Sequence, residues 1–217
     1  MSYSSRISAS EALDLSMSLA VLVIAFSILG ERRVPGLEVI FVSVVGVGSG
    51  FLLHELAHKF VAQMHGYQAE YRANRSGLVF ILIMAFVGFI FAAPGAVMIH
   101  KELRENPFSS TGYLQDDILK KARREQLLIS IAGPMTNIVL AVLFFTVLAG
   151  GLTNSSLLEN AASYAFFINV YLAGFNLLPF GPLDGKKVFE SNSLVWAVVA
   201  VPTILVALSL VLGLGVI

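Results

Sequence analysis

Residues 34–63 read VPGLEVIFVSVVGVGSGFLLHELAHKFVAQ, an apolar run that carries the five residues HELAH at positions 54–58. About 20 helical residues cross the hydrocarbon core of a bilayer, so this run is long enough to span it. An ionisable side chain in a spanning helix costs roughly 2.5–3.5 kcal/mol or more when it faces lipid, and it marks a functional site by default. We therefore expect His54, Glu55 and His58 to face the protein interior.

The spacing of the two histidines favours a metal site. Residues four apart lie on one face of a helix, so His54 and His58 can bind one zinc ion together. Glu55 lies about 100° around the helix, where it can accept a proton from a water molecule held at the metal. The competing interpretation is a chance match whose polar side chains face a loop. Three ionisable residues within five positions of an apolar run argue against it.

The composition extends the membrane prediction to the whole chain. Of 217 residues, 57% are hydrophobic and 13% are charged, whereas a soluble domain carries about 25% charged residues. The sequence predicts an all-α polytopic membrane protein with about five to six hydrophobic segments, in a single domain over residues 1–217. The six apolar segments are Leu13–Leu29, Val34–Gln63, Leu78–Ile99, Leu127–Leu152, Ala161–Phe180 and Leu194–Ile217. The polar stretch 100–126 between the third and the fourth predicts an extramembrane loop that ends in a short amphipathic helix at 116–126.

A zinc site needs a third protein ligand, and the candidates are few. The chain has no cysteine, so the ligand must be His, Asp or Glu. His65 lies roughly 10 Å along the helix from His58, and His100 stands at the edge of another segment. Asp184 follows a stretch interrupted by proline and glycine, and unwound backbone at membrane depth is tolerated mainly around a cavity. The alternative for Asp184 is an ordinary turn after a span.

Three motifs, taken together, resemble the site-2 protease family of intramembrane zinc metalloproteases. They are HExxH at 54–58, GPxxN at 133–137 and NxxPxxxxDG at 176–185, in the family's order. The resemblance implies that His54, His58 and Asp184 bind one Zn²⁺ and that Glu55 is the catalytic acid and base. It also implies that Asn137 and Asn176 help to bind the substrate backbone, and their alternative role is an interhelical hydrogen bond. The catalytic core would cover about residues 40–190, in a minimal member without a PDZ or nucleotide-sensing domain.

A parity argument constrains the third segment, residues 78–99. If it crossed the bilayer, His58 and Asp184 would leave their helices on opposite faces and could not share a metal. We therefore expect five crossings and one re-entrant or β-like segment at 78–99. Cytoplasmic loops are enriched in Lys and Arg, and this arrangement puts most of these residues on the side of the metal. The expected location is the cell membrane, with the active site toward the cytoplasm.

The predicted function is hydrolysis of peptide bonds in transmembrane segments of membrane-anchored proteins. The expected partners are a transmembrane-helix substrate and the lipid bilayer. No basic tract with interleaved aromatic residues points to nucleic acid. Two alternatives remain: an inactive relative that binds membrane helices, and a metal transporter. Gly46 and Gly50 stand at GxxxG spacing, which favours close packing against another helix of the chain over contact with a substrate.

Overall fold

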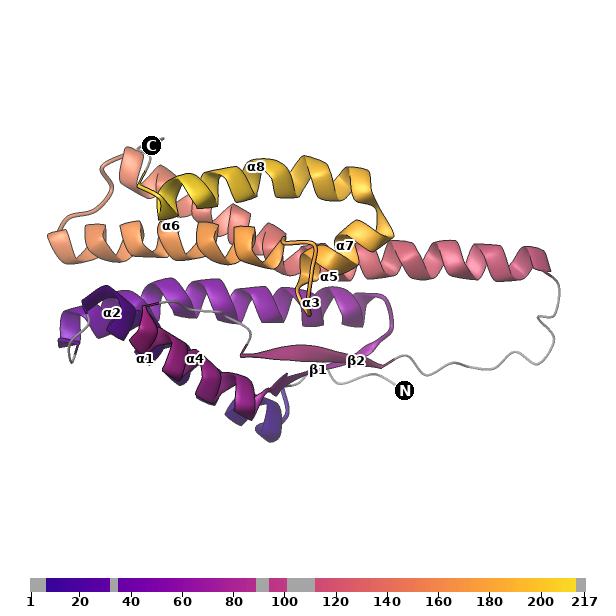
Figure 1. The fold of residues 1–217 in the computed structure, drawn as a ribbon, viewed down its shortest axis with the longest axis horizontal. Coiled ribbons are helices and arrows are strands. Elements are labelled where there is room, and N and C mark those ends of the chain that lie inside the picture. Colours follow the sequence, from indigo (N-terminus) through magenta and orange to yellow (C-terminus); the bar gives the residue numbers. More distant parts are fainter. Residues whose placement is uncertain (1–6, 32–34, 89–93, 101–111, 214–217) are drawn as a thin grey trace.

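The computed structural model describes residues 7–31, 35–88, 94–100 and 112–213. Within them, four helical stretches are long and apolar enough to cross a membrane: Ala9–Leu29, Leu37–Met64, Asp116–Ala149 and Ser193–Val211. They belong to α1 (Ala9–Glu31), the combined helix of α2 and α3, α5 (Gly112–Ala149) and α8 (Ser193–Val211). The helices pack side by side as an elongated bundle (Figure 1). The predicted helical membrane fold is confirmed.

Two of the six predicted segments are not among these four stretches. The fifth forms α6 (Ser156–Asn176), which is 21 residues long but carries polar residues such as Asn169. Helix α6 lies in the interior of the bundle, where it packs against α5, α2 and α8. The third segment contains α4 (Arg75–Val87), whose 13 residues are too few to span a bilayer.

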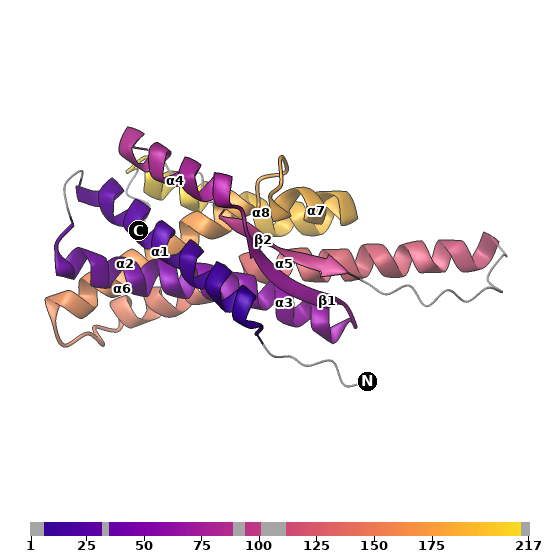
Figure 2. The same ribbon diagram turned by 90° about the horizontal axis from the view of Figure 1, so that it is seen from below.

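The chain leaves the sheet before α4 and returns to the same end of the sheet after it. Strand β1 (Gln68–Ala73) precedes α4, and β2 (Gly95–His100) pairs with β1 in antiparallel register, Ala73 opposite Gly95. The backbone N–H of Asn74 donates to the carbonyl of Pro94 at 2.8 Å, which closes the base of this excursion. The segment predicted as re-entrant or β-like thus combines a short helix with a strand, and the chain on either side of the excursion is joined by the pairing of β1 with β2 (Figure 2).

Helix α1 covers the open edge of β1. Its acidic side chains accept backbone N–H groups of the strand: Glu11 from Tyr71 at 3.1 Å and Asp14 from Ala73 at 3.3 Å. The Tyr71 hydroxyl donates to Ser18 at 2.9 Å, one further turn along the same face of α1. Because these bonds supply partners for strand edge groups, they fix the sheet against α1.

The helix that carries the HELAH residues is interrupted by a π-helical segment. Helix α2 (Leu37–Val47) continues through η1 (Gly48–Leu52) into α3 (Leu53–Met64). π-Helical turns are rare and occur often at functional sites. Gly46 and Gly50 face α6, where an added Cβ would lie 2.9 Å from Tyr164 and 2.9 Å from Leu172, respectively. The predicted packing of these glycines against another helix of the chain is what the structure shows.

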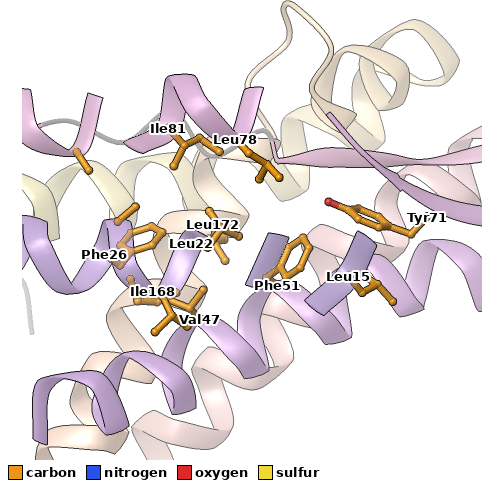
Figure 3. Packing of buried hydrophobic residues seen from close by; sticks show 13 residues of the cluster. Leu15, Leu22, Phe26, Val47, Phe51, Tyr71, Leu78, Ile81, Ile168 and Leu172 are labelled. Atoms are coloured by element: carbon orange, nitrogen blue, oxygen red, sulfur yellow. The ribbon is translucent and has the colours of Figure 1, made fainter. Parts of the chain in front are cut away.

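The largest apolar cluster joins α1, α2, η1, β1, α4 and α6 (Figure 3). Phe51 of η1 meets Tyr71 of β1 edge to face, with ring centroids 5.7 Å apart. Phe51 lies three residues before His54, so this packing fixes the start of α3 relative to the sheet. The cluster residues that Figure 3 labels are Leu15, Leu22, Phe26, Val47, Phe51, Tyr71, Leu78, Ile81, Ile168 and Leu172.

Candidate metal centre

Helix α3 presents its two histidines on one face. His54 and His58 are buried, and their Nε2 atoms lie 3.1 Å apart. The imidazole rings are 4.7 Å apart between centroids, one turn along the helix from each other. Two ring nitrogens therefore point toward one common position.

Asp184 reaches the same position from a distant part of the chain. Its Oδ2 atom lies 3.3 Å from Nε2 of His54 and 2.9 Å from Nε2 of His58. Among the described residues, His54, His58 and Asp184 form a group of possible metal ligands, with their ligand atoms all within 4.8 Å of one another. The structure thus brings together the three residues that the motifs nominate as zinc ligands.

The unwound chain between α6 and α7 (Asp184–Ser191) places this carboxylate. Residues 177–183 include Pro179, Pro182 and Gly181, which has a positive φ of 64°. Proline lacks an N–H and glycine tolerates positive φ, so this sequence ends α6 and starts α7 in a new direction. Gly185 lies so close to the Leu177 carbonyl that a Cβ there would clash with it. Asp184 therefore enters the site at the first residue of α7.

The other nitrogen of each histidine has a hydrogen-bond acceptor. Nδ1 of His58 lies 2.7 Å from the backbone carbonyl of Ile129, and Nδ1 of His54 lies 2.6 Å from Oδ1 of Asn137. An acceptor at Nδ1 keeps the hydrogen there in a neutral ring and leaves the Nε2 lone pair for a metal. These two acceptors favour, in each neutral ring, the form that a zinc ligand needs.

Helix α5 approaches this face at a glycine. A Cβ added to Gly133 would clash with the Nε2 atoms of both His54 and His58. Space next to the ligand atoms is thus kept by the absence of a side chain. Two imidazoles and one carboxylate match the ligand sets of catalytic zinc sites, which keep a fourth position open. The donor set and the space around it fit a zinc ion.

The charge of Asp184 also suits a ligand. Burial opposes ionisation of this carboxyl group, but the closeness of His58 and His54 to its Oδ2 atom holds its pKa below the usual range. The group is therefore a carboxylate, the form that binds metals.

A cavity of about 830 Å³ opens onto these residues. Glu55 lines it together with the three nominated ligands, and β2 borders it with residues 95–99. Lys187 also lines it, with Nζ 3.9 Å from Oδ1 of Asp184. The side chain predicted to move a proton thus shares one space with the candidate metal ligands.

The remaining sequence candidates have different positions. Asn176 lines the cavity and donates to the Leu172 carbonyl at 3.0 Å, a location that suits its predicted contact with a substrate. His65 ends α3 and His100 ends β2, and neither belongs to the group of possible ligands.

Asn137 makes hydrogen bonds within the protein that its motif did not predict. It is fully buried, and its side chain bonds to His54, to the Gly50 carbonyl at 3.2 Å and to Asn169 at 3.1 Å. These contacts support a role in positioning His54. Direct contact of Asn137 with a substrate stays a prediction.

Two further polar groups near the motif helix were not predicted. Lys59, directly after His58, is buried and pairs with Glu11 of α1 at 2.5 Å. Asn169 of α6 is buried behind Asn137. The signal for each was a polar residue in an apolar helical run, which indicates that a partner exists but not which one.

Comparisons with known proteins identify the family of this chain. The family model described as "Peptidase family M50" matches residues 42–154. A Methanocaldococcus jannaschii protein named "Putative zinc metalloprotease MJ0611" is 38% identical over 203 residues, which cover 92% of this chain and 93% of that protein. YwhC of Bacillus subtilis, with the same description, is 30% identical over 161 residues, 64% of each chain. No solved structure gives a significant match. The chain thus belongs to peptidase family M50, the site-2 protease family.

Proposed function

We propose that this protein is an intramembrane zinc endopeptidase that hydrolyses peptide bonds in transmembrane segments of membrane-anchored proteins. The observation that carries the proposal is the meeting of His54, His58 and Asp184 inside a bundle of apolar helices, with Glu55 in the same cavity. The names of the two relatives support zinc and proteolysis as the chemistry.

Each residue then has a defined task. His54, His58 and Asp184 would hold the zinc ion, which when bound supplies a Lewis acid that polarises the scissile carbonyl and makes water more acidic. Glu55 accepts a proton from the attacking water and passes it to the leaving amide nitrogen. Asn176 and Lys187 line the space where the peptide would lie.

The substrate must be extended to react. A transmembrane helix hides its carbonyl groups in its own hydrogen bonds, so a scissile bond becomes accessible only where the helix unwinds. Five residues of β2 border the cavity, and their extended backbone offers hydrogen-bonding groups to an unwound peptide. A cavity of this size also admits the water that hydrolysis consumes.

We further propose that the site faces the cytoplasm. The basic residues Lys120, Lys121, Arg123 and Arg124 lie at the start of α5, which projects beyond the bundle at the end that carries the sheet and α7 (Figure 1). Lys186 and Lys187 of α7 add to this end. An excess of Lys and Arg near the ends of spans marks the cytoplasmic side.

The test combines metal content with cleavage. Detergent-purified wild-type protein should contain about one zinc per chain, and Asp184→Ala should lose it. Glu55→Gln should keep the zinc but cut a tagged single-span membrane peptide with a central Asn-Pro pair at least roughly 100-fold more slowly. Retained cleavage by Glu55→Gln would refute its role in proton transfer. Absence of zinc from wild-type protein after metal loading would favour an inactive, helix-binding relative.

A further inference from the structure

A buried chain of hydrogen bonds runs from the middle of α6 to His54. Asn169 and Asn137 are both fully buried, in helices α6 and α5. A buried amide without partners costs roughly 1–3 kcal/mol, so such groups are found where their hydrogen bonds are made. Here Asn169 bonds to Asn137, and Asn137 bonds to His54.

Two backbone carbonyls determine which atoms donate and which accept in this series of hydrogen bonds. The carbonyl of Ala165 can only accept, so Nδ2 of Asn169 donates to it at 2.8 Å and its Oδ1 faces Asn137. Nδ2 of Asn137 then donates both to Oδ1 of Asn169 and to the carbonyl of Gly50. The other amide atom of Asn137, Oδ1, is therefore the one that faces Nδ1 of His54. Reversing either amide would set two acceptors or two donors against each other.

The π-helical segment brings the Gly50 carbonyl to this network. Gly50 lies in the middle of η1, and a Cβ there would approach Leu172 to 2.9 Å and Asn169 Oδ1 to 3.4 Å. The absence of a side chain at position 50 avoids a close contact with Leu172, whereas the two asparagines would lie at ordinary van der Waals distances from an added Cβ. The helix with the metal ligands thus supplies one of the anchors that orient its own histidine.

We propose that Asn169 is a positioning residue for metal binding. It fixes the orientation of the Asn137 amide, and through it the tautomer and the ring orientation of His54. The inference rests on the zinc site proposed above, but its first consequence, a hydrogen on Nδ1 of His54, concerns the metal-free protein as well. His58 needs no such support, because a backbone carbonyl fixes its ring directly.

The informative variant is Asn169→Thr. Threonine hydroxyls in this structure donate to the carbonyl four residues before them, as Thr136 and Thr203 do at 2.9 and 2.7 Å. The threonine of Asn169→Thr can therefore keep the hydrogen bond to the Ala165 carbonyl, but its side chain is too short to bond to Asn137. Asn169→Asp is the conservative variant, since a protonated carboxyl group can donate to Ala165 and accept from Asn137. The matched control is Ser43→Ala, which removes a buried bond between helices, from Ser27 at 2.9 Å, away from the site.

Two measurements are made on each variant in detergent. Nitrogen-15 NMR of labelled histidine reports the His54 tautomer in metal-free protein, and competition with a chelator reports zinc affinity. Wild type should carry the hydrogen on Nδ1. Asn169→Thr should show mixed His54 tautomers and bind zinc roughly 10–100-fold more weakly. This is the loss typical of mutations that remove hydrogen bonds to metal ligands. Asn169→Asp and Ser43→Ala should stay near wild type.

The outcomes separate this inference from the proposed function. A wild-type His54 with its hydrogen on Nε2, or unchanged tautomer and affinity in Asn169→Thr, would overturn the positioning role. An equal loss of affinity in Ser43→Ala would also overturn it, because any lost buried bond would then suffice. If wild-type protein binds no zinc but the His54 tautomer responds to Asn169→Thr, the effect of Asn169 on His54 is supported and the proposed zinc-dependent function is refuted.

Discussion

The carboxylate of Glu11, in the first turn of α1, lies 2.5 Å from the ammonium nitrogen of Lys59, the residue directly after His58. Both side chains are buried, and the second oxygen of Glu11 accepts the backbone N–H of Tyr71 in β1. One carboxylate therefore joins the metal helix to the sheet that borders the cavity. This link holds the ligands and the cavity wall in a fixed relation.

Breaking this buried pair should destabilise the protein. Lys59→Met leaves Glu11 buried without its cation, which should lower the free energy of unfolding by about 3–5 kcal/mol. The double variant with Glu11→Gln removes both charges and keeps an oxygen for Tyr71, so it should recover part of that loss. Unfolding in detergent with increasing denaturant measures both. Equal losses in the single and the double variant would show that the two charges do not depend on each other.

Gly133→Ala should weaken zinc binding, because its methyl group would clash with Nε2 of both His54 and His58. We expect a loss of roughly 10–100-fold in affinity. Helix propensity alone favours alanine over glycine by about 1 kcal/mol, so a weakened helix would not explain this loss. The control is Gly36→Ala, where an added Cβ meets nothing within 4 Å. Wild-type zinc affinity in Gly133→Ala would mean that the metal does not use this space.

Lys187→Met should lower the efficiency of cleavage while Lys186→Met does not. Lys187 lines the cavity beside Asp184, whereas Lys186 lies 4.0 Å from Glu190 outside it. A cation at the cavity stabilises negative charge that develops on the substrate. Because Lys187 is half exposed, we expect a loss in kcat/KM of no more than roughly fivefold. Steady-state cleavage of the tagged membrane peptide measures kcat/KM. Equal losses in Lys187→Met and Lys186→Met would contradict a role of Lys187 in the site.

Cysteine labelling should place the sheet and the start of α5 on one face of the membrane. The chain has no cysteine, so each introduced thiol is read without background. Gln68→Cys and Lys120→Cys should react with a membrane-impermeant reagent from the cytoplasmic side, and Asn154→Cys, between α5 and α6, from the other. The buried Ala165→Cys serves as the unreactive control. Labelling of Gln68→Cys and Lys120→Cys from opposite faces would contradict the topology.

The sequence predicted the helical membrane class and named the three residues that meet in space. Long apolar runs and the spacing of His54 and His58 are local signals, and Asp184 was nominated by the interrupted stretch before it and by its motif. The structure differs from the sequence prediction where local composition and tertiary packing disagree. The polar residues 116–126 predicted a short separate helix, but they begin the continuous helix α5. Residues 101–111 of the same predicted loop lie outside the described residues.

Other features could not be predicted because they depend on pairs. Asn169 and Asn137 are 32 residues apart, and Glu11 and Lys59 are 48 apart. A single polar residue in an apolar run indicates that some partner exists, yet only the packing of the helices determines which one. The π-helical segment Gly48–Leu52 likewise was not predicted from the sequence.

The two histidines are held by different kinds of acceptor, and this difference has a consequence for how the centre can change over generations. A main-chain carbonyl is present whatever residue occupies position 129, so mutation there cannot easily remove the support of His58. The support of His54 is a property of two side chains, at positions 137 and 169. Substitution at either can shift the strength of metal binding while every ligand stays in place. Metal binding in this protein can thus be adjusted by heritable changes at two residues that are not themselves ligands.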